Sequence, residues 1–357
     1  MISLGETALG VQGVGLVTAV GQSAPASCAA FRAKISNPSE TRFTDAAGQW
    51  IMAHQVELEK PWRGLTKLAR MAAQAIEEAL QAVPRAQWVR LPMLLCVAEP
   101  DRPGRLDALD GQLMATIQEF VGVRFDPAHS AIVAHGRVGL AVALNGARRL
   151  LVSTARSAEQ VLVVAADSLI AGTTLGAYEN EGRLLTERNS NGFMPGEAAG
   201  ALLLGRADGA GDRQAQLAIT GLGFAREAAH IASEEPLRGE GLAAAIRGAL
   251  AEAGVAMHDM DYRIADLSGE HYYFKEASLA LSRTLRQRKE SFDLWHPAEC
   301  AGELGAASGV AMLALAEAAC AKGYTLGPRI LAHWANDNGR RAAATLQWLG
   351  GGSTTSA

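Results

Sequence analysis

Short apolar runs rich in β-branched residues alternate with stretches whose apolar residues recur three or four positions apart. Apolar runs of this kind predict buried strands, and apolar residues at helical spacing predict helices. The alternation therefore indicates an α/β fold, a sheet with helices on its faces. In the first part of the chain the predicted strands are 13–20, 93–98, 131–134, 161–166 and 201–205, and the predicted helices are 65–83 and 137–152.

The same alternation resumes after a segment at 205–214 that is rich in Gly and charge and is predicted to be a linker. Both parts contain a turn of small residues that opens an Ala-rich helix, at 134–149 and at 301–319, which indicates a duplicated fold. Strands are predicted at 218–225, 263–268, 329–334 and 344–348, and helices at 241–254, 275–288 and 304–321. We expect two halves, 1–206 and 215–349, followed by a disordered tail, 350–357.

Composition and charge are those of an ordinary globular protein. The chain has 357 residues, 49% of them hydrophobic and 20% charged, with a formal net charge of -4. This balance gives no electrostatic reason to expect nucleic acid or an anionic membrane as partner. The N-terminus lacks the features of a signal peptide, and no apolar run approaches membrane-spanning length. The cysteines are far apart and fit a reducing compartment, so a cytoplasmic location is expected; they are Cys28, Cys96, Cys300 and Cys320.

The segment LLTERNSNGFMPGEAAGALLL at 184–204 is the most specific motif of the chain. It resembles the R-D-G-F-x-x-G-E-G-A-G signature of the β-ketoacyl-acyl carrier protein synthases, the condensing enzymes of the thiolase superfamily. Residues 10–21 resemble the family's first strand, 65–80 its early helix, and 302–316 its G-H-x-x-G-A-A-G turn and helix. The resemblance covers nearly the whole chain. It implies a thiolase-like fold, two similar α/β halves in a five-layer αβαβα arrangement.

The catalytic residues of that family are missing at the matching positions. Its condensation needs a Cys at a helix-opening turn, activated by the helix N-terminus, and two His residues. Aligned without gaps, the Cys falls on His135 in the turn AHGR, and the two His fall on Ser268 and Glu303. A Lys of the family falls on Ala298. The resemblance therefore implies a site that cannot run the standard condensation.

Three further residues are expected at the former active-site pocket. Arg137 places a cation in the first turn of a helix, where the helix dipole disfavours it and where the family leaves space for an acyl chain. We expect Arg137 to obstruct that tunnel, with Glu303 as its counter-ion. The family's Gly-Phe-Gly-Gly loop, whose backbone helps form the oxyanion hole, falls near ANDNG at 335–339, which brings Asn336 and Asn338 to the pocket.

The signature segment also supplies residues that we interpret as structural. Glycines allow tight turns and close backbone approach, and a carboxylate in apolar surroundings needs internal partners. Glu197 is accordingly interpreted as a buried support rather than a chemical group. The structural residues of this segment are Gly192, Phe193, Gly196 and Glu197.

Other catalytic assignments stay open as alternatives. His135 could act as nucleophile or base, or be a turn residue with satisfied hydrogen bonds. Cys300 could be a relocated nucleophile, since the duplicated fold should bring the 298–303 turn to the pocket of His135, or a buried inert thiol whose pKa Glu303 would raise. His135, Cys300 and Glu303 could be imagined as metal ligands, but no recognisable spacing supports this, and no cofactor is predicted.

Two classes of function follow from the resemblance. The first is a non-catalytic protein that acts by binding, either as a silent partner of an active fatty acid or polyketide synthase, like a chain-length factor, or as an accessory protein, for example of a type VI secretion effector. The second is an acyl-thioester transferase of the 3-oxoacyl-ACP synthase type, or a hydrolase, with a different nucleophile. The missing triad argues against the second class, although a fold does not fix function.

The expected partners follow from the same resemblance. The family pairs the strand at 130–134 with its counterpart across a twofold axis, so a homodimer or a heterodimer with a related synthase is expected. An acyl carrier protein or a secreted effector is a further candidate partner. The segment EHYYFKE at 270–276 mixes aromatic and charged residues and could face a partner protein or form a half-buried edge.

Overall fold

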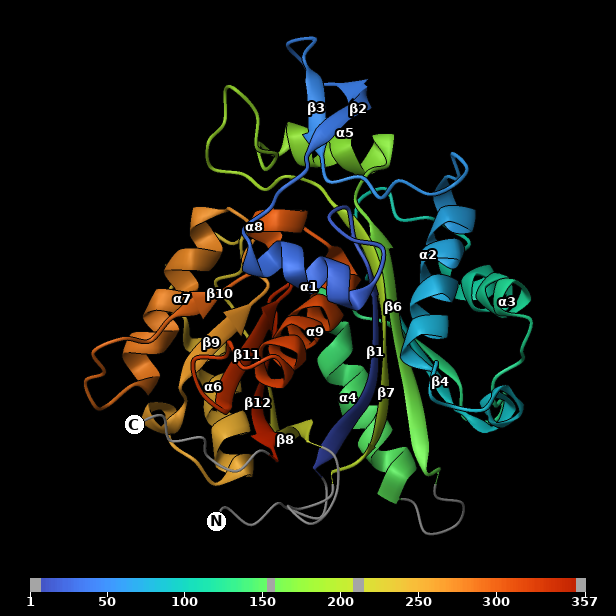
Figure 1. Ribbon diagram of the computed structural model, residues 1–357. Coiled ribbons are helices and arrows are strands. Elements are labelled where there is room, and N and C mark those ends of the chain that lie inside the picture. Colours follow the sequence, from blue (N-terminus) through green and yellow to red (C-terminus); the bar gives the residue numbers. More distant parts are fainter. Residues whose placement is uncertain (1–7, 153–157, 208–214, 351–357) are drawn as a thin grey trace.

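The computed structural model describes residues 8–152, 158–207 and 215–350. Helices and sheet stack in five layers, αβαβα (Figure 1). Helices α2 and α3 cover the outer face of the N-terminal half of the sheet, and α6 and α7 cover that of the C-terminal half. Helices α4 and α9 lie between the two halves and form the central layer. The predicted thiolase-like arrangement is confirmed.

The helices and strands have the following bounds. The α-helices are α1 (Ala24–Arg32), α2 (Gly64–Ala79), α3 (Leu109–Val121), α4 (Gly139–Val152), α5 (Gly172–Asn180), α6 (Glu240–Ala253), α7 (His271–Thr284), α8 (Ala298–Ala301) and α9 (Ser308–Ala321). The 3₁₀ turns are η1 (Arg85–Arg90), η2 (Gly136–Val138), η3 (Met257–Asp259) and η4 (Gly305–Ala307). The strands of the main sheet are β1 (Leu9–Val17), β4 (Met93–Val97), β5 (Ala131–Ala134), β6 (Gln160–Ser168), β7 (Glu197–Arg206), β8 (Gln216–Arg226), β9 (Tyr262–Ala265), β10 (Leu294–Trp295), β11 (Arg329–Ala335) and β12 (Arg340–Leu349); β2 (Ser39–Thr44) and β3 (Trp50–Ala53) form a separate hairpin.

The two halves repeat one strand order. The N-terminal half runs β5-β4-β6-β7-β1 and the C-terminal half runs β10-β9-β11-β12-β8. In each half the first three strands are parallel and the last two pairings are antiparallel. Antiparallel pairing of Leu9 with Ile219 and of Gly10 with Ala218 joins the halves into one ten-stranded sheet. Most of the predicted linker and of the predicted tail lies outside the described residues.

Several predicted elements differ from the structure at their ends, for example the following two. The predicted strand 13–20 is β1 and ends at Val17, because Thr18 and Gly21 exchange backbone hydrogen bonds (2.7 and 3.3 Å) and turn the chain. The predicted helix 275–288 is α7, which begins at His271. EHYYFKE therefore forms the first turns of a helix, and Tyr273 is buried within the protein (2% exposed).

The central helices bring two turns together. Helix α9 is buried along almost its whole length, and its small residues let α4 approach closely: a Cβ added at Gly309 would lie 2.7 Å from Cβ of Leu140. As a result η2 and η4, which open α4 and α9, pack against each other. Gly136 and Gly305 have positive φ in these turns (53° and 55°), a conformation that favours glycine. The fold thus places one helix-opening turn from each half at a common point.

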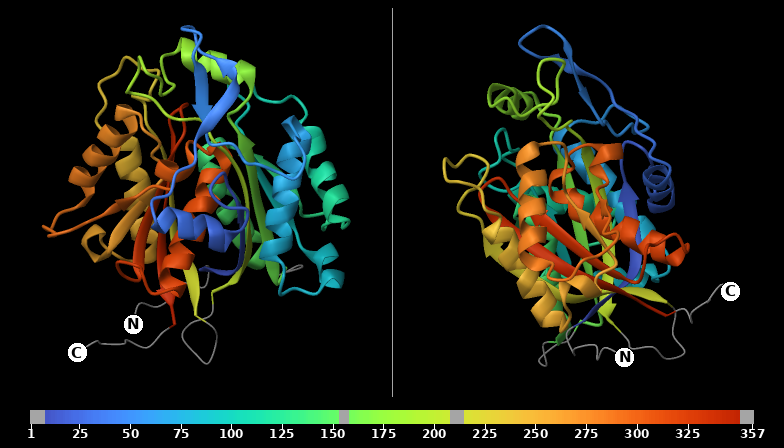
Figure 2. Two further views of the ribbon diagram at one scale, coloured as in Figure 1. Left: turned by 45° about the horizontal axis from the view of Figure 1, so that its top comes forward. Right: turned by 90° about the vertical axis from the view of Figure 1, so that its left-hand side faces the viewer.

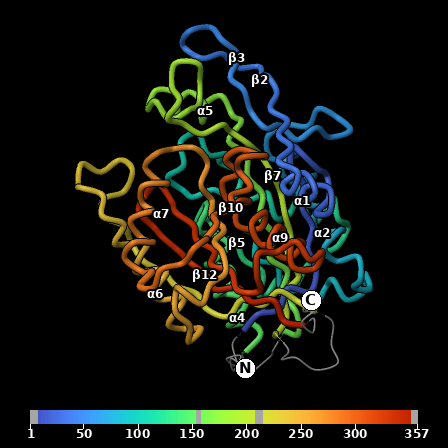
Figure 3. The backbone as a smooth tube through the Cα atoms, turned by 60° about the vertical axis from the view of Figure 1, so that its left-hand side comes forward, coloured from blue at the N-terminus to red at the C-terminus, as the bar shows by residue number. Residues whose placement is uncertain are grey.

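The hairpin β2–β3 and helix α5 lie together at one end of the molecule (Figure 2). On the central layer, α1 packs against α9 (Figure 3). No helix among the described residues is long and apolar enough to cross a membrane. Within the same residues, no group of His, Cys, Asp and Glu side chains is arranged to hold a metal ion.

Candidate functional site

His135 lies at the start of the first turn but does not face the point where the two turns meet. Arg340 donates to its Nδ1, and desolvation together with the Arg340 charge lowers the pKa of His135. Asn336 clamps the same turn: its Nδ2 donates to the backbone oxygen of His135 (2.8 Å) and its Oδ1 accepts from the backbone N–H of Val138 (3.1 Å). Asn336 thereby satisfies two backbone groups of the turn.

Arg137 occupies the meeting point and is 7% exposed. Its guanidinium donates to Tyr273 Oη (2.7 Å) and Asp337 Oδ1 (2.5 Å) and pairs with Glu303 Oε2 (3.3 Å). Asp266 Oδ2 is 3.9 Å away, and the Tyr273 ring centroid is 4.6 Å from Cζ. The predicted Arg137–Glu303 pair is therefore present.

Glu303 and Ser268, which the sequence resemblance aligns with the two His residues of the synthases, differ in their hydrogen bonding. Glu303 Oε1 accepts from the backbone N–H of Gly305 (2.9 Å), so this carboxylate also satisfies the second turn. Ser268 Oγ is buried and has no hydrogen-bond partner among the described residues. A hydroxyl in that state cannot replace an imidazole as a proton acceptor and donor.

Two more arginines extend the charge network around Arg137. Arg183 forms paired hydrogen bonds with Glu270 (2.7 and 2.9 Å) and binds Asp337 (2.6 Å), and Arg102 forms paired bonds with Glu99 (both 2.8 Å). Arg102 also lies 3.4 Å from Asp167. We call this set the ionic cluster; its members are Glu99, Arg102, Arg137, Asp167, Arg183, Asp266, Glu270, Glu303 and Asp337.

The ionic cluster is closely packed. The space left among the side chains that line it is about 10 Å³, room for about one water molecule. Every guanidinium in it is paired with at least one carboxylate, and its members supply no thiol. Arg137 is thus one of several charged side chains that fill this point of the fold.

Burial and charge act in opposite directions on the carboxyl groups of the cluster. Burial raises the pKa of Asp266 to about 7, although Arg137 pulls it down. Burial would also raise the pKa of Asp337, but Arg137 and Arg183 lower it well below its ordinary value. Asp337 is therefore ionised at neutral pH, whereas burial favours the protonated form of Asp266.

Cys300 lies elsewhere, so the expectation that it shares a pocket with His135 is wrong. It sits on α8, three residues before Glu303, and lines a separate cavity, because the helix ends at Ala301 and the chain turns at Gly302 (φ 72°) before it reaches Glu303. Burial and then Glu299 raise the pKa of the Cys300 thiol to about 11; Glu303 has no part in it. A thiol in that state is a poor nucleophile at neutral pH.

Asn338 does not lie at the pocket where we expected it. It binds Asp101 at the protein surface (3.1 Å) and lines no part of the ionic cluster, and Asn336 serves the turn as described. The residue between them, Asp337, is the one that reaches the cluster. Glu99, Asp167 and Asp266 carried a signal in the sequence, since each is a charge that directly follows an apolar run. The other cluster members that the sequence analysis missed lie among polar or charged residues and carried no such signal: Arg102, Arg183, Glu270 and Asp337.

The signature residues lie where the chain is tightly packed. A Cβ on Gly192 would lie 2.5 Å from the carbonyl carbon of Leu184, and one on Gly196 would lie 2.3 Å from Ala301 O. Phe193 is 2% exposed and meets Tyr178 edge to face (5.1 Å). Their interpretation as structural residues agrees with this packing.

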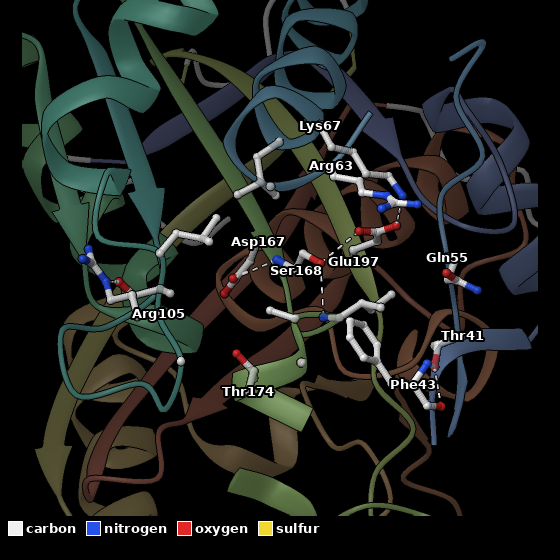
Figure 4. A pocket seen from close by; sticks show the side chains of 18 of the residues that line it. Thr41, Phe43, Gln55, Arg63, Lys67, Arg105, Asp167, Ser168, Thr174 and Glu197 are labelled. Atoms are coloured by element: carbon white, nitrogen blue, oxygen red, sulfur yellow. Dashed lines mark hydrogen bonds and ion pairs between the residues drawn. The ribbon is translucent and has the colours of Figure 1, made fainter. Parts of the chain in front are cut away.

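Glu197 is 3% exposed and accepts from Val56 N–H (2.9 Å), from Ser168 Oγ (2.9 Å) and from Lys67. Figure 4 shows Lys67 and Ser168 directed at this carboxylate. The surrounding pocket has a volume of about 560 Å³ and lies between α2, the hairpin β2–β3 and α5. Arg102 lines both this pocket and the ionic cluster, so it separates the two.

Replacing Arg137 by Met should lower the free energy of unfolding by about 3–5 kcal/mol, because the carboxylates around it lose their cation. Urea denaturation of the two proteins measures this difference. Arg247→Met, on the exposed face of α6, removes the same charge and should change stability by less than about 0.5 kcal/mol. Equal stabilities of the two variants would show that Arg137 is not a structural centre.

Replacing Asp266 by Asn should change how stability depends on pH. The native state holds the Asp266 proton more tightly than the unfolded chain does, so the wild type loses stability as pH rises from about 4 to about 7. The amide side chain of the variant cannot ionise and can still accept the hydrogen bond from Ala335 N–H. The stability of the variant relative to wild type should therefore increase over this range in urea titrations at several pH values, and parallel profiles would contradict the assignment.

No protein-family model and no curated protein matches this sequence. Solved structures do match. A ketosynthase in complex with its chain length factor from Xenorhabdus doucetiae gives a TM-score of 0.73 at 14% identity, over 95% of this chain and 97% of that chain. The ishigamide ketosynthase/chain length factor gives 0.69 at 19% identity, over 96% and 99%. A type II polyketide synthase acyl-carrier protein in complex with its ketosynthase gives 0.73 at 15%, over 95% and 98%. The chain therefore has the thiolase-like fold of ketosynthases and chain length factors.

Proposed function

We propose that this protein is a non-catalytic relative of the ketosynthases that acts by binding, as the silent partner of an active ketosynthase subunit. The observation that carries the proposal is the ionic cluster. A ketosynthase needs an open channel that ends at a nucleophile, and here that place holds buried ion pairs and space for about one water molecule. Such a site has neither the group that forms the thioester nor room for the acyl chain.

The alternative of an enzyme with a relocated nucleophile finds less support. Cys300 is 1% exposed, its pKa is raised to about 11, and it lies in another cavity than the former catalytic turn. His135 pairs with Arg340, whose charge lowers its pKa, but no described residue orients it toward a substrate. Neither residue has the base, or the orienting third group, that activates a nucleophile.

The edge strand β5 supports a role in pairing. It is the last strand of its half of the sheet and, among the described strands, is hydrogen-bonded to β4 alone, which leaves its other edge free. Its sequence AIVA is apolar and exposed or half-buried throughout. Free apolar edges invite pairing with another strand, and natural proteins cover or interrupt them. Two of the similar solved structures contain a ketosynthase with its chain length factor, an assembly of the proposed kind.

We expect no β-ketoacyl product when the protein is incubated with malonyl-carrier and acyl-thioester substrates, and no acyl adduct by intact-protein mass spectrometry at neutral pH. Both results follow from the missing thiol and the filled channel. An active ketosynthase, assayed in parallel, is the positive control. Product that disappears in His135→Ala, or a stoichiometric adduct that disappears in Cys300→Ser, would restore the enzyme class.

We also expect the protein to form a dimer through β5, either alone or with an active ketosynthase from the same organism. Ile132→Lys places a charge on the pairing strand and should give a monomeric mass, or aggregation, in light scattering coupled to size-exclusion chromatography. Leu326→Lys changes a residue that is 49% exposed and precedes β11, a strand of the other half of the sheet, and should leave the mass unchanged. A wild-type protein that stays monomeric both alone and with the ketosynthase would contradict the proposed pairing role.

A further inference from the structure

A second cavity, of about 250 Å³, lies apart from the ionic cluster and shares none of its lining residues. It is enclosed by α1, β10, α8 and the C-terminal end of α9. Figure 1 shows α1 crossing in front of α9 below α8. Its deepest side chains are almost fully buried: Phe31 is 4% exposed, Leu315 5% and Cys300 1%. The cavity thus has buried apolar side chains at its base and opens to solvent at its rim.

Aromatic rings dominate the walls of this cavity. Phe31, Trp295 and Tyr324 come from three separate parts of the chain. Trp295 is backed by Tyr262, with ring centroids 4.5 Å apart, which fixes its position. Rings gain from offset or edge-to-face contact with other rings beyond the burial of their area. The walls thus favour a ligand that contains an aromatic ring.

The charges at the rim leave one cation without an anionic partner among the described residues. Lys34 forms an ion pair with Glu299. Arg32 lies over the Tyr324 ring (4.5 Å from Cζ to the centroid) and forms no hydrogen bond or ion pair with any described residue. Burial lowers the pKa of His296 and raises that of Cys300 to about 11, so neither carries charge at neutral pH. The net charge of the lining is therefore positive, and Arg32 is the group available to an anion.

We propose that this cavity binds a small aromatic carboxylate, with its ring among Phe31, Trp295 and Tyr324 and its carboxylate on Arg32. A guanidinium offers parallel N–H donors that match a carboxylate, so this pairing is stronger than one with a neutral group. A neutral ring would leave Arg32 unpaired, and a cationic ring would be repelled by Arg32. The volume suits one substituted ring, since larger ligands occupy pockets of about 300–1,000 Å³. The site is independent of the silent-partner role.

The test uses the whole protein with 5-fluorotryptophan in place of tryptophan and follows ¹⁹F NMR spectra. Trp295→Phe assigns the Trp295 resonance. The probes are benzoate, the neutral benzyl alcohol and the cationic benzamidine, which share one ring. Benzoate should shift the Trp295 resonance in a saturable way, benzyl alcohol should bind about tenfold more weakly, and benzamidine should not bind.

A pair of matched variants isolates the carboxylate contact. Arg32→Gln should weaken benzoate about tenfold and leave benzyl alcohol within about twofold. Arg70→Gln is the control, because Arg70 is also exposed and stacked on an aromatic ring, Phe120 at 4.0 Å, but lines neither this cavity nor the larger pocket. It should leave the affinity for benzoate unchanged. Both positions are at the surface, so both variants should fold.

Four outcomes would overturn the proposal. Equal affinities for benzoate and benzyl alcohol would show that the carboxylate does not contribute to binding. An unchanged benzoate affinity in Arg32→Gln would show that Arg32 does not bind it. A benzoate-dependent shift at Trp62 in place of Trp295 would assign the ligand to the larger pocket, which Trp62 lines. An absence of any shift at millimolar benzoate would show that the cavity takes no such ligand.

Discussion

The arrangement of the site depends on one buried guanidinium. Arg137 binds carboxylates that follow α8, follow β9 and sit in the turn between β11 and β12, together with a phenol on α7. Removing these charges from water is costly, and the cost is offset only if every partner arrives in hydrogen-bonding position. The cation of one half thus fixes several loop and strand ends of the other half, and the same contacts leave no space at their centre.

The duplicated fold explains why this centre lies where it does. Each half ends a parallel strand with a tight turn and a buried helix, and η2 and η4 are the two copies of that turn. Each turn is also packed against a carboxylate from the N-terminal half of the sheet: a Cβ at Gly136 would lie 2.0 Å from Glu99 Oε2, and one at Gly305 would lie 2.1 Å from Asp167 Oδ2. Backbone geometry thus brings turns together whatever their side chains are. The residues at the turns decide whether the result is a reactive site or a set of ion pairs.

Most helices and strands could be predicted from the sequence, whereas most members of the ionic cluster could not, and both results have physical reasons. Buried strands and helices produce a local periodicity of apolar residues, so the bounds of most elements were predicted to within a few residues. The Arg137–Glu303 pair followed from one resemblance and one charge rule. The pairing of Asp337 with Arg183 could not be predicted in this way, because it joins residues 154 positions apart and leaves no local pattern. Cys300 was misplaced for the same reason: proximity to Glu303 in sequence does not fix the direction of a side chain on a short helix.

The two ends of the ten-stranded sheet are equivalent by duplication but unequal in length. β5 offers four residues along its free edge, whereas β10 has two. A sheet with two long open edges could add further copies at both ends and grow into a fibre. Here only one edge is long enough to hold another strand in register, and association through it uses up the site of growth. The proposed pairing through β5 would therefore not be repeated at β10, the other end of the sheet.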